Sequence, residues 1–167
     1  MWYRLLHPRV AVVIVAGVER PNLMTLAWHT PVSDEGIVAV AIDKENYTYE
    51  LIKKCREFTM NVLSIDQIKV IWTCGTVSGR ETDKVKLTGI VLEDGVKIKT
   101  KHIKDSLGFL ECIVEKEIDC GDHALFLARV VYWKAREFRK VWRESARVAM
   151  HVGSVFFCYP SKYRRAK

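Results

Sequence analysis

Residues 22–33 read Asn22-Leu-Met-Thr25-Leu-Ala-Trp-His-Thr30-Pro-Val-Ser33. The stretch starts as a short apolar run typical of a strand and ends just after a proline, shortly before a second apolar run begins at Ile37. Two interpretations remain open on these residues alone. One is a strand followed by an ordinary turn. The other is an edge that binds a polar, planar or phosphorylated ligand, because Thr25, Thr30 and Ser33 place hydroxyls and free backbone groups around one spot.

Apolar and β-branched runs on both sides of this stretch predict a largely antiparallel β-structure. Residues 10–17 form a first predicted strand, which turns at 17–21 into a second over 23–28. A connection at 33–36 leads to a third over 37–42, and we expect these three strands to be antiparallel neighbours. Further strands are predicted over 58–63, 110–119, 124–133 and, at an edge, 155–159, with a small hairpin over 91–98 turning at 93–95.

Two short helices interrupt the predicted strands. Thr48 has the form of an N-cap for a helix with Tyr49, Ile52 and Cys55 on one face. Residues 64–67, Ser-Ile-Asp-Gln, form a capping box for a second helix that carries isoleucines and Trp72 on one face and ends at Gly75. Residues 74–89 are predicted as a loop, and 136–150 are ambiguous between an amphipathic helix and an extended arm. The fold class is therefore mainly β, a closed or nearly closed antiparallel β-barrel with short helices.

Composition limits the class of protein. The 167 residues suit a single domain, 1–167, with a basic C-terminal arm over about 136–167. The net charge of +7 favours anionic partners such as nucleotides, but no nucleic-acid recognition motif is present. Five cysteines without metal-ligand spacing indicate free thiols in a reducing cytosol and no metal site. No apolar run is long enough to span a membrane, so we expect a cytoplasmic protein.

Nucleotide-binding motifs of the Rossmann and P-loop types do not occur in the chain. A different group of residues suits a phosphate. Ser78, Gly79 and Arg80, followed by Asp83-Lys84, supply a hydroxyl, a glycine that permits close backbone approach and two cations within seven residues. A solvated, charged surface loop is the alternative interpretation of the same segment.

The order and spacing of five segments carry a family resemblance. They are Asn22-x-x-Thr25-x-Ala27-Trp28-x-Thr30-Pro31-Val32-Ser33, Thr48-Tyr49-Glu50, Phe58-x-x-Asn61-Val62, Ser78-Gly79-Arg80-x-x-Asp83-Lys84 and Gly121-Asp122-His123. In this respect the chain closely resembles the flavin reductase-like, FMN-binding split-barrel family over roughly residues 8–133. A weaker likeness follows at His151-Val-Gly153.

The resemblance implies a six-stranded antiparallel split barrel that works as a homodimer and binds FMN near the subunit interface. It also implies hydride transfer from NADH or NADPH to flavin. The implied FMN-binding residues are Asn22, Thr25, Leu26, Ala27, Trp28, Thr30, Pro31, Ser33, Thr48, Ser78, Gly79, Arg80, Asp83 and Lys84. In this comparison the 22–33 segment lines the ring and ribityl chain, while Thr48 and the 78–84 loop serve the phosphate and the ring edge.

His123 is the implied catalytic-site residue, placed where it would position the reductant. The interpretation from the residue alone is different, since a histidine after a turn commonly satisfies backbone groups. Two positions depart from the family pattern. Ala27 stands where many relatives have serine, which removes a hydroxyl that could bond flavin, and Ala128 stands where a glycine is frequent.

Two functions are compatible with this resemblance. The first is an NAD(P)H-dependent FMN reductase. The second is a flavin-bound electron-transfer protein, like flavoredoxin, that docks a redox partner. Two roles of the basic arm remain open: it could dock an acidic protein or cover the partner subunit. Since the cofactor carries the hydride chemistry, no catalytic dyad is expected in either case.

We predict that the protein is a homodimer in solution. A single split barrel leaves a strand edge and part of the flavin groove open, and a two-fold partner would cover both. Light scattering of the flavin-loaded protein should give about twice the chain mass of 19.3 kDa. A mass equal to that of one chain at micromolar concentration, with flavin still bound, would contradict the prediction.

Overall fold

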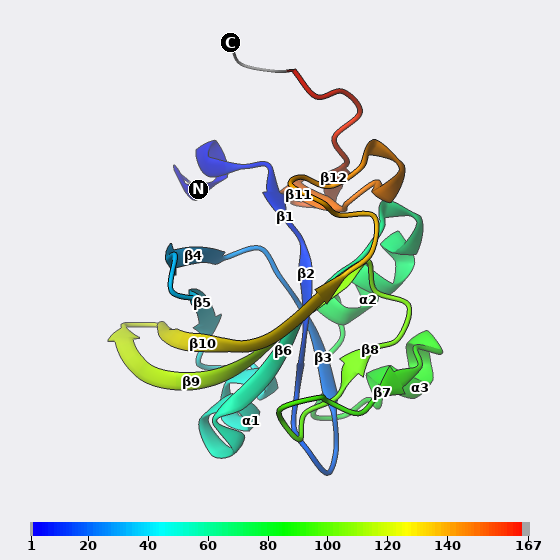
Figure 1. Cartoon of the computed structure of the whole chain (residues 1–167). Coiled ribbons are helices and arrows are strands. Elements are labelled where there is room, and N and C mark those ends of the chain that lie inside the picture. Colours follow the sequence, from blue (N-terminus) through cyan, green and yellow to red (C-terminus); the bar gives the residue numbers. More distant parts are fainter. Residues whose placement is uncertain (1, 165–167) are drawn as a thin grey trace.

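A curled, antiparallel sheet of seven strands forms the body of the molecule (Figure 1). The computed structural model describes residues 2–164. Across the sheet the order is β3 (Asn22–Leu26), β2 (Val12–Ala16), β6 (Glu57–Val62), β9 (Gly108–Cys120), β10 (His123–Ala135), β5 (Ile37–Asp43) and β4 (His29–Ser33). The mainly β prediction is confirmed, but the sheet is not closed, and its two edges, β3 and β4, are successive segments of the 22–33 stretch.

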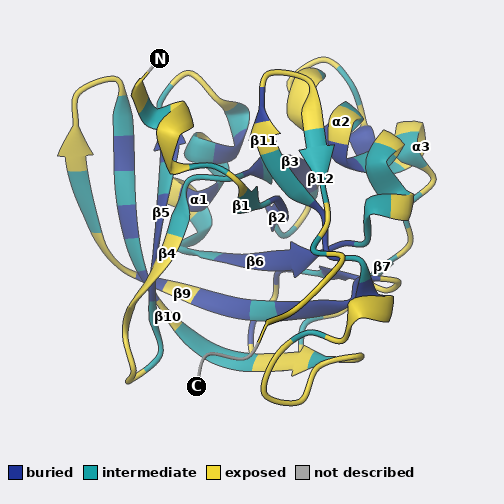
Figure 2. Cartoon of the chain, turned by 90° about the horizontal axis from the view of Figure 1, so that it is seen from above, coloured by how far each residue is buried: buried dark blue, intermediate teal, exposed yellow. Residues whose placement is uncertain are grey.

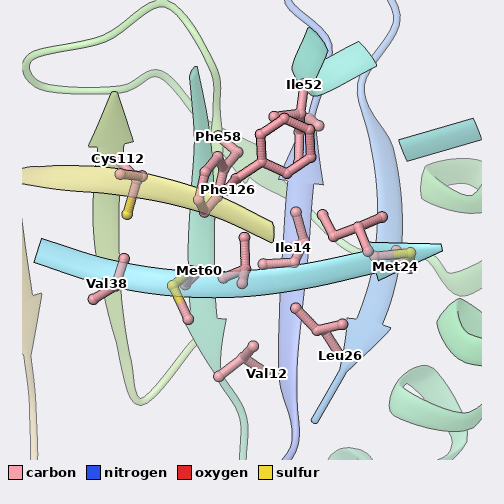
Figure 3. Packing of buried hydrophobic residues seen from close by; sticks show 14 of the residues in the cluster. Val12, Ile14, Met24, Leu26, Val38, Ile52, Phe58, Met60, Cys112 and Phe126 are labelled. Atoms are coloured by element: carbon pink, nitrogen blue, oxygen red, sulfur yellow. The ribbon is translucent and has the colours of Figure 1, made fainter. Parts of the chain in front are cut away.

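The continuous apolar run of β2 is explained by burial on both faces. Val12, Ile14 and Ala16 point into the inside of the curled sheet, while Val13 and Val15 belong to a second apolar cluster on the outer face. Figure 3 shows the inner cluster, in which side chains of β2, β3, β5, β6, β9, β10 and α1 meet. β6 is likewise buried over most of its length (Figure 2).

The helices cover the outer face and one end of the sheet. α2 (Ile68–Thr76) packs Ile71 and Cys74 into the outer cluster, next to the short α3 (Lys84–Thr88). The predicted capping box is confirmed, because Ser64 and Gln67 bond each other's backbone at the start of η2 (Ile65–Gln67), which leads directly into α2. The N-terminal η1 (Trp2–Leu6) lies on the opposite side of the molecule from α3 (Figure 1).

Three local predictions were wrong. α1 (Tyr47–Cys55) begins after Asn46, and Thr48 is a buried residue of its first turn instead of its cap. Residues 74–89 contain α3, capped by Asp83, whose side chain accepts from the Lys86 N–H. Residues 91–98 do not form a hairpin, because β7 (Leu92–Glu93) pairs with the later β8 (His102–Ile103).

Strand pairing around residues 22–33 also differs from the prediction. β3 pairs with β2 but not with β5, and the unpredicted strand β4 takes the place beside β5. The sheet therefore has seven strands instead of six.

Over residues 136–164 the basic arm is extended, not helical, apart from η3 (Glu144–Ala146), and residues 165–167 of the predicted arm lie outside the described residues. After η3 the arm enters a small three-stranded sheet of β1 (Arg9–Val10), β11 (Met150–Gly153) and β12 (Phe156–Cys158), in which β12 confirms the predicted edge strand. None of the helices in residues 2–164 is long and apolar enough to cross a bilayer. Within the same range, no three His, Cys, Asp or Glu side chains are grouped to hold a metal ion.

Glu111 is a buried carboxylate of β9. It is 0% exposed, and its two oxygens accept the backbone N–H groups of Val96 and Lys97 at 2.6 and 2.7 Å. Residues 94–101 have little regular structure to satisfy their own backbone. Glu111 therefore fastens this segment onto β9.

We predict that Glu111→Ala lowers the free energy of unfolding by about 2–4 kcal/mol, since two backbone donors lose a charged acceptor in a buried position. Chemical denaturation followed by circular dichroism measures the effect. Glu19→Ala, which removes an exposed carboxylate in the 17–21 turn, is the matched control and should change stability by less than about 0.5 kcal/mol. Equal stabilities of the two variants would contradict the role given to Glu111.

Candidate functional site

A cavity of about 400 Å³ opens where the sheet is split between β3 and β4. Its walls come from the end of β3 with the two residues after it, the end of β5, the residue before α1, the first residue of β10, one face of α2, and the β11–β12 hairpin. The lining residues are Met24, Thr25, Leu26, Ala27, Trp28, Ala41, Ile42, Asp43, Asn46, Ile71, Trp72, Gly75, Thr76, His123, His151, Ser154 and Phe157. A volume of this size suits a ring system of cofactor dimensions.

A smaller and more polar hollow of about 190 Å³ adjoins the cavity. Met24, Asn46, Gly75 and Thr76 line both, so the two spaces are direct neighbours. The remaining residues of the hollow are Asn22, Glu45, Tyr47, Thr48, Cys74, Val77, Ser78, Gly79 and Lys84. The site thus has a broad, largely apolar part and a narrow, polar part.

Trp28 and His123 form a flat aromatic wall of the broad part. Their rings stack with centroids 5.0 Å apart and an interplanar angle of 28°. The Trp28 carbonyl accepts the Ala41 N–H at 2.9 Å, while His123 begins β10 opposite Asp43 of β5. Backbone pairing to β5 thus places both rings, and a planar ligand can stack on or beside them.

The His123 ring is hydrogen-bonded to a side chain of its own turn. His123 Nδ1 lies 2.9 Å from Asp122 Oδ1. The hydrogen bond to His123 is the main reason why the pKa of the exposed Asp122 carboxyl lies below its ordinary value. Asp122 consequently stays ionised at neutral pH and orients the imidazole ring.

The narrow part is organised by the start of α1. Asn22 is buried and donates from Nδ2 to the Thr48 hydroxyl at 2.9 Å. Gly79 lies directly against Asn22, and a Cβ atom at Gly79 would sit 1.9 Å from Asn22 Oδ1. The N-cap residue Asn46 makes no side-chain cap bond. The Tyr49 N–H donates to the Asn46 carbonyl at 3.0 Å, so the first-turn donors that an anion can meet are the N–H groups of Tyr47 and Thr48.

Lys84 is nearly buried at the base of the hollow. Its ammonium donates to the carbonyls of Leu23 and Cys74 at 2.7 and 2.9 Å, which joins β3 to the end of α2. Burial lowers the pKa of Lys84 from its ordinary value. An ammonium has three donors, and two are used here, so one is left for a ligand.

The other predicted residues lie outside the lining of both spaces. Arg80 pairs with Glu50 at 2.8 Å and donates to the Glu45 carbonyl at 3.0 Å, which places it over the first turn of α1. Asp83 caps α3. Thr30 and Pro31 line separate apolar hollows at the barrel mouth, and Ser33 accepts the Glu35 N–H in the following turn. Of the hydroxyls in 22–33, only that of Thr25 faces the cavity region, where it donates to the Ile71 carbonyl at 2.5 Å.

Several lining residues were not predicted. Asn46 preceded the wrongly placed helix start, and Trp72 was assigned only to an apolar helix face. His151 was noted in the His-x-Gly segment without a role, and Phe157 only within an edge strand. Their place in the cavity depends on the packing of α2 and of the β11–β12 turn. No local sequence pattern predicts that packing.

Acid–base or nucleophilic chemistry has little support here. Cys74 lines the narrow part, but burial raises the pKa of its thiol to about 11, so it stays protonated at neutral pH. The site offers shape, aromatic surface and hydrogen-bond donors. These properties suit binding of a reactive cofactor better than catalysis by side chains alone.

Comparison with known proteins gives a consistent result. Residues 3–149 match the family model described as a flavin reductase like domain. An uncharacterised protein of Archaeoglobus fulgidus is 39% identical over 128 residues, which cover 76% of this chain and 72% of that relative. An NADH-dependent FMN reductase of Streptomyces nodosus subsp. asukaensis is 29% identical over 130 residues, 75% and 68% of the two chains.

The fold is also found among solved structures. The crystal structure of an FMN-binding protein from Thermus thermophilus with bound p-hydroxybenzaldehyde superimposes with a TM-score of 0.87. The match has 25% sequence identity and covers 96% of this chain and 91% of that one. The expected split-barrel fold is therefore confirmed.

We predict that Lys84→Met lowers the free energy of unfolding at neutral pH by about 1–3 kcal/mol, because two buried carbonyls lose their donor. The loss should grow as the pH rises. The folded-state pKa of Lys84 lies below its ordinary value of 10.5, so the folded protein binds fewer protons than the unfolded chain between the two pKa values, and the wild type gains stability there.

Urea unfolding of both proteins in a series of buffers from neutral pH to pH 10.5 measures this difference. Lys86→Met is the control, since Lys86 is exposed on the same helix. A stability difference that is zero at neutral pH, or that shrinks as the pH rises, would contradict the role of Lys84.

Proposed function

This chain belongs to the flavin reductase-like domain family, and from this membership and the two-part cavity we propose that it is an FMN-binding oxidoreductase that transfers hydride from NADH or NADPH to flavin. One observation carries the proposal: a broad, mostly apolar cavity next to an aromatic wall shares lining residues with a narrow hollow rich in hydrogen-bonding groups. A flavin ring and a phosphate need these two environments, joined in this way.

The residues present fit FMN. Thr25, Leu26, Ala27 and Trp28, with α2 opposite, would hold the ring. Asn22, Thr48, Ser78, Gly79 and the remaining Lys84 donor would bind the phosphate end, next to the open first turn of α1. Arg80 would contribute through the local positive charge only, because its guanidinium already bonds Glu50 and the Glu45 carbonyl.

The reaction requires little acid–base chemistry from the protein. FMN, when bound, would supply the hydride acceptor. The chain's own residues orient the ring, exclude water and position the nicotinamide. His123 is the residue that we assign to the last task, because it lines the cavity on the stacked face of Trp28 and is oriented by Asp122.

The homodimer forms part of this proposal. Exposed apolar side chains surround the mouth of the curled sheet, including Trp2, Leu6 and Val32. A second subunit that covered this side would bury them and shield the adjoining cavity from water. With this assembly we place the protein in the cytoplasm, where NADH and NADPH are available.

The visible spectrum of the purified protein, before and after anaerobic addition of NADH or NADPH, tests the proposed function. A flavin absorbance that is bleached by either nucleotide supports it. Titration with FMN and riboflavin tests the phosphate end, and FMN should bind more tightly. Flavin that is bleached by dithionite but by neither nucleotide would contradict the reductase and favour a flavin-bound electron carrier.

We predict that His123→Ala slows flavin reduction by NAD(P)H about 10-fold or more while FMN affinity and melting temperature change little, because general positioning effects are of this size. His123→Gln keeps a polar group and should restore part of the rate. Anaerobic stopped-flow absorbance gives the rate, and FMN titrations and thermal melts provide the controls. An unchanged rate with a lowered melting temperature would assign His123 to the turn alone.

A further inference from the structure

The two chain segments that form the small three-stranded sheet lack acidic residues. Residues 2–18, which include β1, contain two arginines and no Asp or Glu, and the same absence holds for residues 145–164, which include β11 and β12. In the described part of the chain, no carboxylate lies within ion-pair distance of Arg4 or Arg9. This end of the molecule therefore carries positive charge without a local counter-charge.

The short helix η1 divides its side chains between two sides of the molecule. A 3₁₀ helix has about three residues per turn, so residues three apart share a face. Tyr3 and Leu6 line the hollow at the barrel mouth, which the proposed second subunit covers. Arg4 and His7 are the next such pair, and the His7 N–H donates to the Arg4 carbonyl at 3.2 Å. This second pair faces the β11–β12 hairpin instead.

Arg4 and His7 both contact the hairpin next to residues that line the cavity. A Cβ atom built on Gly153 would lie 3.5 Å from Arg4 Cδ, so the stem of Arg4 lies across this glycine. The His7 ring packs edge-on against His151 with centroids 5.0 Å apart, and His7 Nδ1 donates to the His151 carbonyl at 2.9 Å. His151 and Ser154 line the broad part of the cavity. Arg4 and His7 thus stand at its outer edge, and we call this pair the basic rim.

The basic rim has hydrogen-bond donors to offer a ligand. Within residues 2–164, no hydrogen-bond acceptor is bonded to the Arg4 guanidinium. His7 uses Nδ1 for the His151 carbonyl, so Nε2 donates to an anion when the ring is protonated. A guanidinium presents a planar fork of N–H groups that matches two oxygens of one phosphate. The rim therefore suits a phosphate group.

The basic rim lies at the opposite end of the site from the narrow hollow. The hollow adjoins the start of α1, where we place the phosphate of FMN, and the described residues that line it include none from η1, β11 or β12. Figure 1 shows η1 and β11 at one end of the molecule and α1 at the other. A single phosphate cannot occupy both ends. With FMN in place, the rim is left for a second anion.

We propose that Arg4 and His7 bind a phosphate group of the pyridine nucleotide that reduces the flavin. The inference rests on the proposed function for the identity of the ligand. NADH and NADPH both carry a pyrophosphate, and NADPH carries an additional 2′-phosphate. All of these groups present phosphate oxygens to the guanidinium fork. His151 and Ser154 lie between the rim and the space for the ring, where the sugar next to the nicotinamide would pass.

Arg4→Met tests the rim, because methionine keeps an unbranched stem over Gly153 and removes the guanidinium. The probes are ADP, which carries the pyrophosphate, and adenosine 2′,5′-bisphosphate, which carries the 2′-phosphate. Neither probe can reduce flavin, so titration calorimetry reports binding alone, and excess FMN keeps the narrow hollow occupied. We expect at least one probe to bind the wild type and to bind Arg4→Met about 10-fold or more weakly, since a charge-assisted hydrogen bond is lost.

Two further variants separate the fork from the charge. Lys99→Met removes an exposed cation between β7 and β8 and should keep wild-type affinity for both probes. Arg4→Lys keeps the charge without the fork and should give an intermediate affinity. In steady-state assays, Arg4→Met should raise KM for the nucleotide about 10-fold and leave kcat nearly unchanged.

The relative affinity of the two probes for the wild type identifies the phosphate. Tighter binding of the bisphosphate assigns the rim to the 2′-phosphate, and NADPH is then the preferred reductant. Equal or tighter binding of ADP assigns the rim to the pyrophosphate that both reductants share. Either result supports the inference, provided that Arg4→Met weakens the binding.

The inference would be overturned if neither probe bound the wild type, or if Arg4→Met and Lys99→Met weakened binding equally. Weaker binding of FMN but not of the probes by Arg4→Met would also overturn it, because the rim would then hold part of the flavin. A change of oligomeric state in Arg4→Met alone would assign the rim to a subunit interface. If the probes bound through Arg4 but neither NADH nor NADPH bleached the flavin, the proposed reductase would fail while the phosphate site stood.

Discussion

The fold and the site both depend on a change of hydrogen-bonding partner within residues 22–33. Up to Leu26 the chain pairs with β2, where Leu26 lies opposite Val12. From His29 onward it pairs with β5, opposite Val40. The two residues between, Ala27 and Trp28, cross from one edge of the curled sheet to the other. Because β3 and β4 do not pair with each other, the sheet stays split at this point, and the split is where the cavity opens.

Much of the strand content was predictable because the apolar runs that form strands are buried on one or both faces. The apolar run of β2 is continuous because it has a core on either side, whereas in β6 the inner-core residues Phe58, Met60 and Val62 alternate with the buried polar residues Thr59 and Asn61. Pairing was less predictable. β4 consists of His-Thr-Pro-Val-Ser and is mostly exposed, so it lacks the apolar signal of a strand, and its role is fixed only by the free edge of β5. The hairpin prediction for residues 91–98 was wrong for a related reason, because the strand that pairs with β7 is β8, which follows later in the chain.

The site was predictable only in part, and the division has a physical cause. Asn22, Thr25, Trp28, Thr48 and Gly79 occupy motif positions, and the fold does bring them to the cavity and its hollow. A motif position does not reveal which way a polar atom is bonded. Lys84 holds two carbonyls together, Asp83 caps a helix, and Arg80 lies on the first turn of α1. Side chains contributed by α2 and by the β11–β12 turn could not be found from sequence, because tertiary packing alone places them.

The two parts of the site are built from different interactions, so each part would bind a different portion of a ligand in a different way. The narrow part depends on polar side chains such as Asn22 and Thr48 and on the open first turn of α1, so its selectivity comes from hydrogen bonding to an anion. The broad part is formed by the backbone of residues 25–28 and by aromatic ring faces. Ala27 supplies no hydroxyl there, and the Thr25 hydroxyl is already bonded to Ile71. A ring bound in the broad part would therefore be held by stacking and by backbone groups of residues 25–28, whose direction is set by the same crossing between β3 and β4 that splits the sheet.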